Sequence, residues 1–502
     1  MTRARAPFSP TLFTAILLCG AGASAQDTQG IAPHPSLLRY PELEFTPPER
    51  DAHRRVLPSG VPVYVVEDHS LPLVDLTVYV RTGAYLEPAG KAGLASMTGA
   101  LIRSGGTDSL APDAFDEELA FLAANVTSSI GDTEGTAAFN CLSKDFDRVL
   151  ELFVEMLRSP RFDATRLEVL RKQVLQDLAR RNDETPSIES RSWERLIRGK
   201  DFFTADRTTK ASIESITRED MDAIHARCYH PSRFIIALSG DLAPDAVGKL
   251  DAALSAWART DAGPALSPIP KPSNDPPPGV HIIDKPSVNQ GRASIGHLST
   301  TRDDPEYHAL LIMNQILGGG GFTSRITSRV RSDKGLAYTA ASRYEFGVWF
   351  PGAFRAFFQS KSETVAEAAA IVIEEVRRLL DEGVTPEEVS TAASYAIGLL
   401  PRSFATPNAV ATTLANDEFT GRDPTFWRTY TAKVKAVTPE AVQRAARGHL
   451  HPDKIVILLV GNREAMLAGK ARLEEALEKV SLPKETRTIP LPDPLTLEVP
   501  AN

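Results

Sequence analysis

Apolar residues along the chain follow two spacings, which predict strands and helices that alternate through its length. Period-two or continuous apolar runs predict strands at residues 61–66, 73–81, 280–284 and 292–298. Apolar residues at the three-to-four spacing of a helix occur at residues 93–103, 146–157, 167–181, 307–317 and 365–380. Strands and helices mixed in this way predict an α+β sandwich, with a sheet that has helices packed on one side.

Two segments of the chain repeat the same local design. A threonine with an acidic first turn opens a predicted helix, a His-Pro pair ends it, and a buried apolar strand stops at glycine. The matching residues lie 221 positions apart and are Thr217 and Thr438, His230 and His451, and Gly240 and Gly461. Three landmarks at one offset indicate a duplication, so the sequence predicts two related halves.

Proline-rich composition separates these halves. Six prolines between 268 and 278 exclude helix and central strand, which predicts an extended linker at 263–278. The sequence predicts a signal peptide at 1–25, an extended arm at 26–50, an N-terminal domain at 51–262, the linker at 263–278, a C-terminal domain at 279–483 and a tail at 484–502.

The first residues predict export. Arg3 and Arg5 precede a short apolar run, and small residues up to Ala25 are typical of a signal cleavage site, which indicates a periplasmic location. Cys19 leaves a lipoprotein as an alternative, although the bulky Leu18 before it disfavours this. Of the remaining cysteines, Cys141 and Cys228, buried free thiols are favoured and a disulfide stays open. The net charge of -8 disfavours a nucleic-acid partner.

Several motifs of the first half resemble the insulinase-like (pitrilysin and mitochondrial-processing-peptidase, M16) family of zinc metallopeptidases. They are Leu57-Pro58-Ser59-Gly60, Val80-Arg81-Thr82-Gly83-Ala84 and Glu87-Pro88-Ala89-Gly90 leading to Gly93-Leu94-Ala95. The likeness resumes in the second half and covers most of the chain after 25. It implies two duplicated α/β-sandwich halves, and it implies a peptidase ancestry.

The resemblance fails at the metal site. In active relatives the helix that opens here carries His-x-x-Glu-His, in which two histidines bind zinc and the glutamate acts as general base. The matching positions are Ser96, Gly99 and Ala100, and the family's third ligand falls nearest to Asp177. The sequence therefore predicts no metal and no cofactor in this chain.

Histidines elsewhere offer no replacement for these ligands. None lies between His69 and His225, so the helices of the expected metal site contain none. His225 and His230 flank one helix end, and His449 and His451 flank the equivalent end in the second half. Because these corners repeat each other, we interpret them as structural.

The second half keeps two other elements of the family pattern. A glycine run, Gly318, Gly319, Gly320 and Gly321, precedes Arg331 and Tyr338. The resemblance implies that the glycines help to bind substrate, that Arg331 holds the peptide, and that the Tyr338 hydroxyl stabilises the oxyanion. A purely structural role for these residues remains the alternative.

In two-subunit members of the family, one chain binds zinc and the other, non-catalytic chain carries the Arg/Tyr pair. This sequence resembles the non-catalytic chain, because it lacks the zinc-binding motif and keeps the Arg/Tyr pair. The resemblance implies a heterodimer with a zinc-bearing homologue, in which this chain contributes Arg331 and Tyr338 in trans and peptides add as a strand to a sheet edge. One alternative is a structural or peptide-binding scaffold of the same fold. A less favoured one is an active zinc metalloendopeptidase with an unrecognised site.

Overall fold

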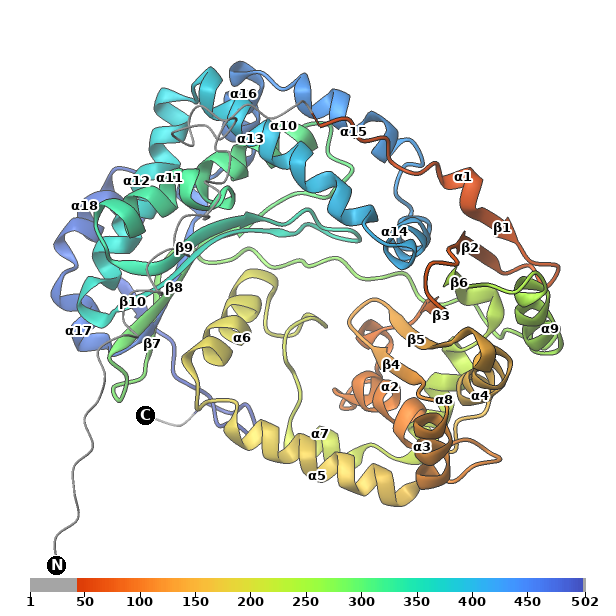
Figure 1. Ribbon diagram of the computed structural model, residues 1–502. Coiled ribbons are helices and arrows are strands. Elements are labelled where there is room, and N and C mark those ends of the chain that lie inside the picture. Colours follow the sequence, from red (N-terminus) through yellow and green to blue (C-terminus); the bar gives the residue numbers. More distant parts are fainter. Residues whose placement is uncertain (1–42, 500–502) are drawn as a thin grey trace, which may run out of the picture. The chain divides into compact units, whose positions relative to one another are not determined.

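The computed structural model describes residues 43–499 of the chain. The predicted signal peptide, Cys19 and residues 26–42 of the predicted arm lie outside the described residues. Residues from Phe45 onward belong to one unit of the structure, and within it two sheets of six strands each are present among the described residues. The predicted α+β architecture of two related halves is confirmed (Figure 1).

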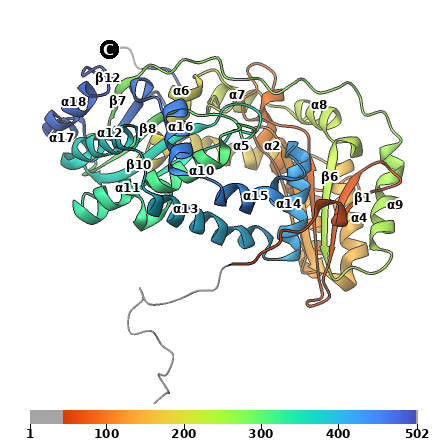
Figure 2. The same cartoon turned by 90° about the horizontal axis from the view of Figure 1, so that it is seen from above.

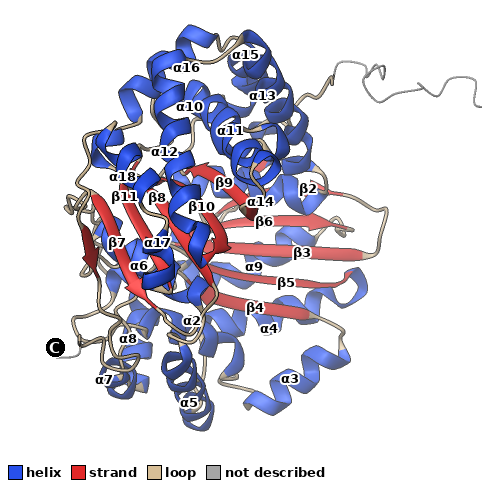
Figure 3. Ribbon diagram, turned by 90° about the vertical axis from the view of Figure 1, so that its left-hand side faces the viewer, coloured by secondary structure: helices blue, strands red, loops and turns tan. Residues whose placement is uncertain are grey.

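The first half is built around a mixed sheet with the strand order β1-β2-β6-β3-β5-β4 (Figure 3). Only β2 and β6 run parallel. The strands are β1 (Arg54–Val56), β2 (Pro62–Glu67), β3 (Leu73–Val80), β4 (Asn125–Ile130), β5 (Gly135–Leu142) and β6 (Phe234–Gly240). The helices are α1 (Arg50–His53), α2 (Leu94–Ser104), α3 (Pro112–Phe121), α4 (Phe146–Arg158), α5 (Ala164–Arg180), α6 (Thr185–Arg198), α7 (Lys210–Ser215), α8 (Arg218–Cys228) and α9 (Ala246–Ala258).

The second half has the corresponding order β12-β7-β11-β8-β10-β9, in which β7 runs parallel to both β11 and β12. Its strands are β7 (Gly279–Asp284), β8 (Gln290–Leu298), β9 (Ala337–Tyr344), β10 (Ala353–Lys361), β11 (Val456–Gly461) and β12 (Thr486–Thr488). Its helices are α10 (Tyr307–Asn314), α11 (Arg325–Thr327), α12 (Val365–Glu382), α13 (Pro386–Leu399), α14 (Pro407–Thr420), α15 (Phe426–Lys435), α16 (Pro439–His449), α17 (Arg463–Ala468) and α18 (Ala471–Glu478).

The landmarks of the duplication have the same local structure in both halves. Thr217 caps α8 by accepting a hydrogen bond from the Asp220 N–H, and Thr438 caps α16 by accepting one from the Ala441 N–H. Each helix is followed by a short 3-10 turn that starts at the proline after His230 or His451 and leads into a buried central strand, β6 or β11. The repeated pattern therefore builds the centre of each sheet.

Each half contributes one helix that packs on the sheet of the other half. Helix α6, from the first half, packs on β8 and β11 of the second sheet, and α14, from the second half, packs on β6 and β2 of the first. Figure 2 shows α14 on one side of the first sheet and α4 and α9 on the other. Helices on one side only were expected, so this part of the prediction was incomplete. From the sequence, an amphipathic helix is expected to pack on the sheet that is formed by the strands nearest to it along the chain. This expectation fails here, because α6 and α14 each pack on the sheet of the other half.

A cluster of charged side chains ties α14 to the first sheet. The Glu418 carboxylate accepts hydrogen bonds from the Arg54 guanidinium at 2.7 and 2.9 Å and from the Tyr64 hydroxyl at 2.5 Å, and Arg50 lies 2.8 Å away. Burial alone would raise the pKa of Glu418, but the hydrogen bonds from Arg54, Tyr64 and Arg50 outweigh it and lower the pKa to about 2. Glu418 is therefore charged at neutral pH and fixes the contact between the halves.

Residues 263–278 contain neither helix nor strand. The Arg233 guanidinium holds the start of this segment by donating to the carbonyl oxygens of Ala262 and Pro264 at 2.7 and 2.8 Å. Cys141 and Cys228 are free and buried, as favoured from the sequence. Within residues 43–499, no helix combines the length and the apolar character that a membrane crossing requires. The predicted domain boundaries themselves stay a prediction.

Candidate functional site

Helix α2 occupies the position at which the zinc-binding helix was expected, and a buried glutamate fixes its start. Gly93 precedes the helix with a φ of 98° and offers no side chain to cap it. Instead, the Glu87 carboxylate accepts hydrogen bonds from the N–H groups of Gly93 at 3.1 Å and Ala95 at 2.9 Å. Burial raises the pKa of Glu87, and the two N–H groups and Arg207 oppose this shift.

Strand β4 occupies the space that a catalytic glutamate would need. A Cβ atom placed on Gly99 would lie 2.3 Å from the Ile130 nitrogen and 2.7 Å from the Ser129 carbonyl carbon, both of which belong to the β4 backbone. These distances are far inside van der Waals contact, and backbone atoms of a paired strand cannot swing away as a side chain can. Glycine is therefore required at 99 by the packing of α2 on β4.

The other residues at this place do not fit a zinc ion either. Ser96 is exposed, and its hydroxyl donates to the Gly93 carbonyl oxygen at 3.1 Å. Ala100 presents a methyl group, and Asp177 is exposed on α5. A hydrolytic zinc needs three fixed nitrogen, oxygen or sulfur ligands and one open position, which these side chains do not supply. The side chains at positions 96, 99, 100 and 177 therefore do not form a catalytic zinc site.

Histidines at the two repeated corners make local structural contacts. His225 donates from Nε2 to the Leu157 carbonyl oxygen at 2.8 Å and stacks on Tyr229. His230 accepts from the Ser232 N–H at 3.2 Å, and the His451 N–H donates to a ring nitrogen of His297 at 3.1 Å. Among residues 43–499, no three His, Cys, Asp or Glu side chains form a group that could hold a metal ion.

Arg331 and Tyr338 lie together on the surface of the second half, where Phe322 joins them. The Arg331 guanidinium carbon is 4.4 Å from the centre of the Phe322 ring and 4.5 Å from the centre of the Tyr338 ring. Phe322 is 66% and Tyr338 is 81% exposed, so a cation stands between two aromatic rings in contact with solvent. Such contacts contribute about 0.5–1 kcal/mol each at exposed sites, enough to orient the side chains.

The backbone explains why these side chains meet. Arg331 lies in a π-helical turn, η7 (Ser328–Asp333), and Gly335 then adopts a φ of 62° that reverses the chain. Strand β9 begins at once, so Tyr338 returns beside Arg331. Neither the Arg331 guanidinium nor the Tyr338 hydroxyl has a hydrogen-bond partner in the described part of the chain. Both remain available as donors to another molecule.

Three of the four glycines are needed for close packing. Gly318 and Gly319 end the π-helical turn η5 (Gln315–Gly319) that continues α10, Gly320 follows it, and Gly321 begins a 3-10 turn, η6 (Gly321–Thr323). A Cβ atom on Gly318 would lie 2.5 Å from the Ser342 nitrogen, and one on Gly319 would lie 2.7 Å from the side-chain nitrogen of Asn314. Gly320 would meet the Gln315 carbonyl oxygen at 2.6 Å, whereas Gly321 is exposed and has a φ of 63°. Contact with a substrate stays a prediction for all four.

Two sheet edges flank these elements. Among the residues that the structure describes, β4, against which α2 packs, pairs only with β5, and β9, which starts beside Arg331, pairs only with β10. An unpaired edge offers free N–H and C=O groups to an extended peptide. Sequence reasoning did not identify either strand as an edge. It also missed Phe322, for which an aromatic residue directly after a glycine run was the available signal.

Comparison with known families agrees with this geometry. The family described as insulinase (peptidase family M16) matches residues 63–198, and the peptidase M16 inactive domain matches residues 215–395. The chain belongs to the M16 family of insulinase-like proteins.

Individual relatives are similar over most of their length. The non-peptidase homolog YmxG of Helicobacter pylori is 24% identical over 422 residues, which are 82% of this chain and 94% of the relative. The crystal structure of a peptidase M16 inactive domain from Pseudomonas fluorescens aligns with a TM-score of 0.73 at 27% identity, covering 82% of this chain and 98% of that one. The periplasmic protease PqqL of Escherichia coli shares the fold, with a TM-score of 0.68 at 14% identity over 82% of this chain and 46% of that one. This chain is thus similar to inactive members of the family.

Proposed function

We propose that this chain is the non-catalytic subunit of an exported metallopeptidase. It pairs with a zinc-bearing homologue, and its own contribution is to bind peptide and to stabilise the oxyanion that forms at the partner's metal. The observation that carries this proposal is the pair of donors without hydrogen-bond partners, Arg331 and Tyr338, which lie exposed beside Phe322, while the β4 backbone occupies the space that a catalytic glutamate at position 99 would need.

The chemistry of this pair suits such a role. A tetrahedral intermediate gains most from hydrogen-bond donors that are in place before charge develops, because no reorganisation is then needed. A phenol hydroxyl is a suitable donor to an oxyanion, and a guanidinium suits a peptide carbonyl or carboxylate. The cation between two rings restricts both side chains before a partner arrives. Strand β9 lies next to them and can guide an extended peptide by main-chain hydrogen bonds.

Export rests on the basic and apolar pattern of residues 1–25. On the basis of that pattern, we propose that this chain and its partner subunit act in the bacterial periplasm. Zinc is assigned to the partner and not to this chain, because the residues at 96, 99, 100 and 177 do not provide a ligand set.

Complementation tests this function. The chain is mixed with a homologue that carries His-x-x-Glu-His, and cleavage of a quenched fluorescent peptide library is followed. We expect the mixture to cleave peptides that neither chain cleaves alone. Tyr338→Phe should lower kcat by about 10²–10³, as removal of one oxyanion donor does, and Arg331→Ala should raise KM. Tyr395→Phe, which alters a tyrosine that is 45% exposed on α13, is the matched control and should change nothing.

Two results would contradict this proposal in different ways. If the complex forms and Tyr338→Phe leaves kcat unchanged, the chain acts as a scaffold, and the complementing role is wrong. If the purified chain cleaves peptides without any partner, the proposal fails as a whole and an unrecognised catalytic site has to be sought.

A further inference from the structure

A pocket lies where α6 meets the C-terminal segment, and the residues that line it are distant in sequence from Arg331 and Tyr338. Its volume is about 400 Å³, within the usual range for small-molecule sites. Leu196 of α6 forms one wall, and Ile489, Leu491 and Val499 of the C-terminal segment form another. The interior is therefore largely apolar.

The walls of this pocket are fixed to the rest of the fold. The Ile489 N–H donates to the Ile282 carbonyl oxygen at 2.8 Å, which holds the segment against β7. The Asn182 side chain donates to the Pro492 carbonyl oxygen at 2.8 Å, and the Lys210 N–H donates to the Leu495 carbonyl oxygen at 2.7 Å. The pocket is thus a built feature and does not depend on one loose loop.

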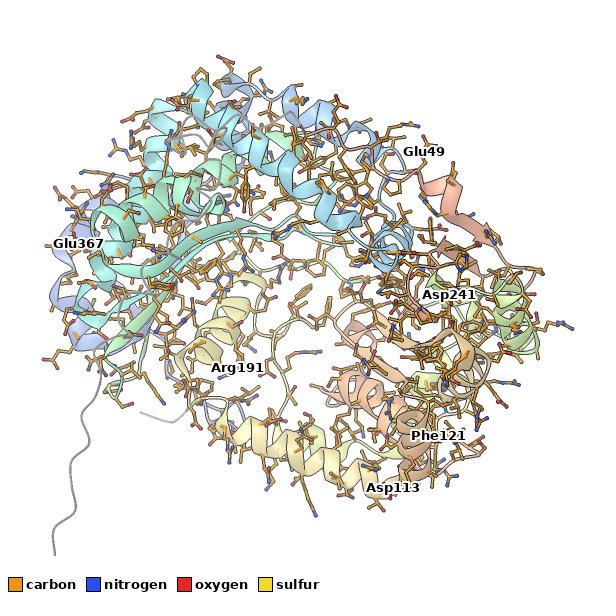
Figure 4. The ribbon with its side chains drawn as sticks, viewed as in Figure 1. Glu49, Asp113, Phe121, Arg191, Asp241 and Glu367 are labelled. Atoms are coloured by element: carbon orange, nitrogen blue, oxygen red, sulfur yellow. The ribbon has the colours of Figure 1, made fainter. Side chains whose placement is uncertain are left out.

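Arginines dominate the polar part of the lining. Arg191, Arg195 and Arg487 line the pocket, and Asp206 is the one carboxylate that lines it among the described residues (Figure 4 labels Arg191). Asp206 is already engaged, because it lies 3.1 Å from the Arg181 guanidinium and 3.7 Å from that of Arg191. The nearby His281 adds no charge at neutral pH, since burial lowers its pKa and its Nε2 donates to the Pro277 carbonyl oxygen.

The positive charge of the arginines that line the pocket is only partly balanced by the lining carboxylate, Asp206. Within residues 43–499, Arg195 and Arg487 have no hydrogen-bond acceptor or ion-pair partner for their guanidinium groups. Arg181, which pairs with the lining residue Asp206 but does not itself line the pocket, is 8% exposed, and its Nε and Nη2 atoms are buried without a partner. Burial and the neighbouring arginines lower the pKa of Arg191, and Asp206 only partly opposes this. An anion in the pocket would relieve the repulsion and could accept hydrogen bonds from Arg195 and Arg487, which line it.

We propose that this pocket binds a carboxylate that carries an apolar chain. The guanidinium fork of arginine matches a carboxylate in two parallel hydrogen bonds, which Arg195 and Arg487 are free to make. The apolar walls bury the attached chain. The C-terminal end of a peptide with an apolar last residue and a free fatty acid both have this chemistry. The proposal is independent of the complementing role of Arg331 and Tyr338.

Calorimetric titration of the full chain tests this site with three probes. They are an N-acetylated hexapeptide ending in Leu-Leu with a free carboxylate, the same peptide as its C-terminal amide, and decanoate. We expect at least one carboxylate probe to bind, and the Arg195→Ala, Arg487→Ala double variant to weaken that binding at least about tenfold, because two charge-assisted hydrogen bonds are lost. Arg218→Ala, an exposed arginine on α8, is the control and should bind as the unaltered chain does.

The set of probes that bind shows whether the ligand is a peptide C-terminus or a fatty acid. Binding of the peptide acid together with at least tenfold weaker binding of its amide assigns the pocket to peptide C-termini, and binding of decanoate alone assigns it to fatty acids. The proposal is overturned if neither carboxylate probe binds at millimolar concentration, or if the double variant, shown by circular dichroism to be folded, binds as tightly as the unaltered chain.

Discussion

Gly99→Glu is expected to destabilise the first half severely and to leave it without zinc, even when Ser96→His and Ala100→His accompany it. The added Cβ alone would lie 2.3 Å from the β4 backbone, so α2 and β4 must move apart. Overpacking of this kind costs about 1–3 kcal/mol. Burying the carboxylate beside an apolar core adds several kcal/mol more, roughly. The sum approaches the total stability of an ordinary domain.

Two variants separate packing from chemistry. Gly99→Ala introduces only the methyl group and should still lower the thermal midpoint of unfolding by several degrees, whereas Ser96→His on the exposed face of α2 should leave it nearly unchanged. Scanning calorimetry checks both. A fully stable Gly99→Glu chain would show that β4 yields easily and that the loss of the catalytic glutamate has no structural cause.

Glu189→Ala is expected to release α6 from the second sheet. Glu189 is 1% exposed, and its carboxylate accepts hydrogen bonds from Arg292 at 2.5 Å, from Arg355 at 3.0 Å and from the Ser294 hydroxyl. Alanine would leave two half-buried guanidinium groups and a buried hydroxyl without their shared acceptor. Breaking a buried charge pair in this way costs about 3–5 kcal/mol. Faster amide hydrogen exchange in α6, measured by mass spectrometry, would report the release.

Glu214→Ala provides the matched control for that experiment. Glu214 forms an exposed ion pair with Lys210 on α7, and such pairs contribute about 0–1 kcal/mol. Unchanged exchange in α6 after Glu189→Ala would mean that the apolar contacts of Ile188, Trp193 and Ile197 hold the helix without the charge cluster.

Strong apolar periodicity was sufficient to predict the central elements from sequence. The strands at β2, β3, β7 and β8 and the helices α2, α4, α5, α10 and α12 lie within a few residues of the predicted ranges. The strands β4, β5, β9 and β10 were not predicted. The edge strands β4 and β9 carry polar residues on one face, with Ser and Thr in β4 and Ser, Thr and Ala in β9, which weakens their apolar pattern. These two edges lie beside α2 and Arg331, so part of the missed structure lies next to the candidate site.

Parts of the site could not be predicted because they depend on contacts between distant segments. Glu189 is a lone acid on an amphipathic helix until Arg292 and Arg355 of the other half surround it. Gly99 marks the absence of a base in the sequence, but its approach to Ile130 becomes evident only when α2 and β4 are placed together. The arginine-lined pocket joins α6 with a segment almost 300 residues later in the chain.

Zinc content tests the central claim most directly. The purified chain is dialysed against zinc, freed of loosely bound ions on a desalting column, and analysed for metal while its hydrolysis of peptides is followed. The structure predicts far less than one zinc ion per chain and no cleavage, because α2 offers no ligand and β4 fills the place of the base. One tightly bound zinc ion per chain, accompanied by peptide hydrolysis that a chelator abolishes, would contradict it.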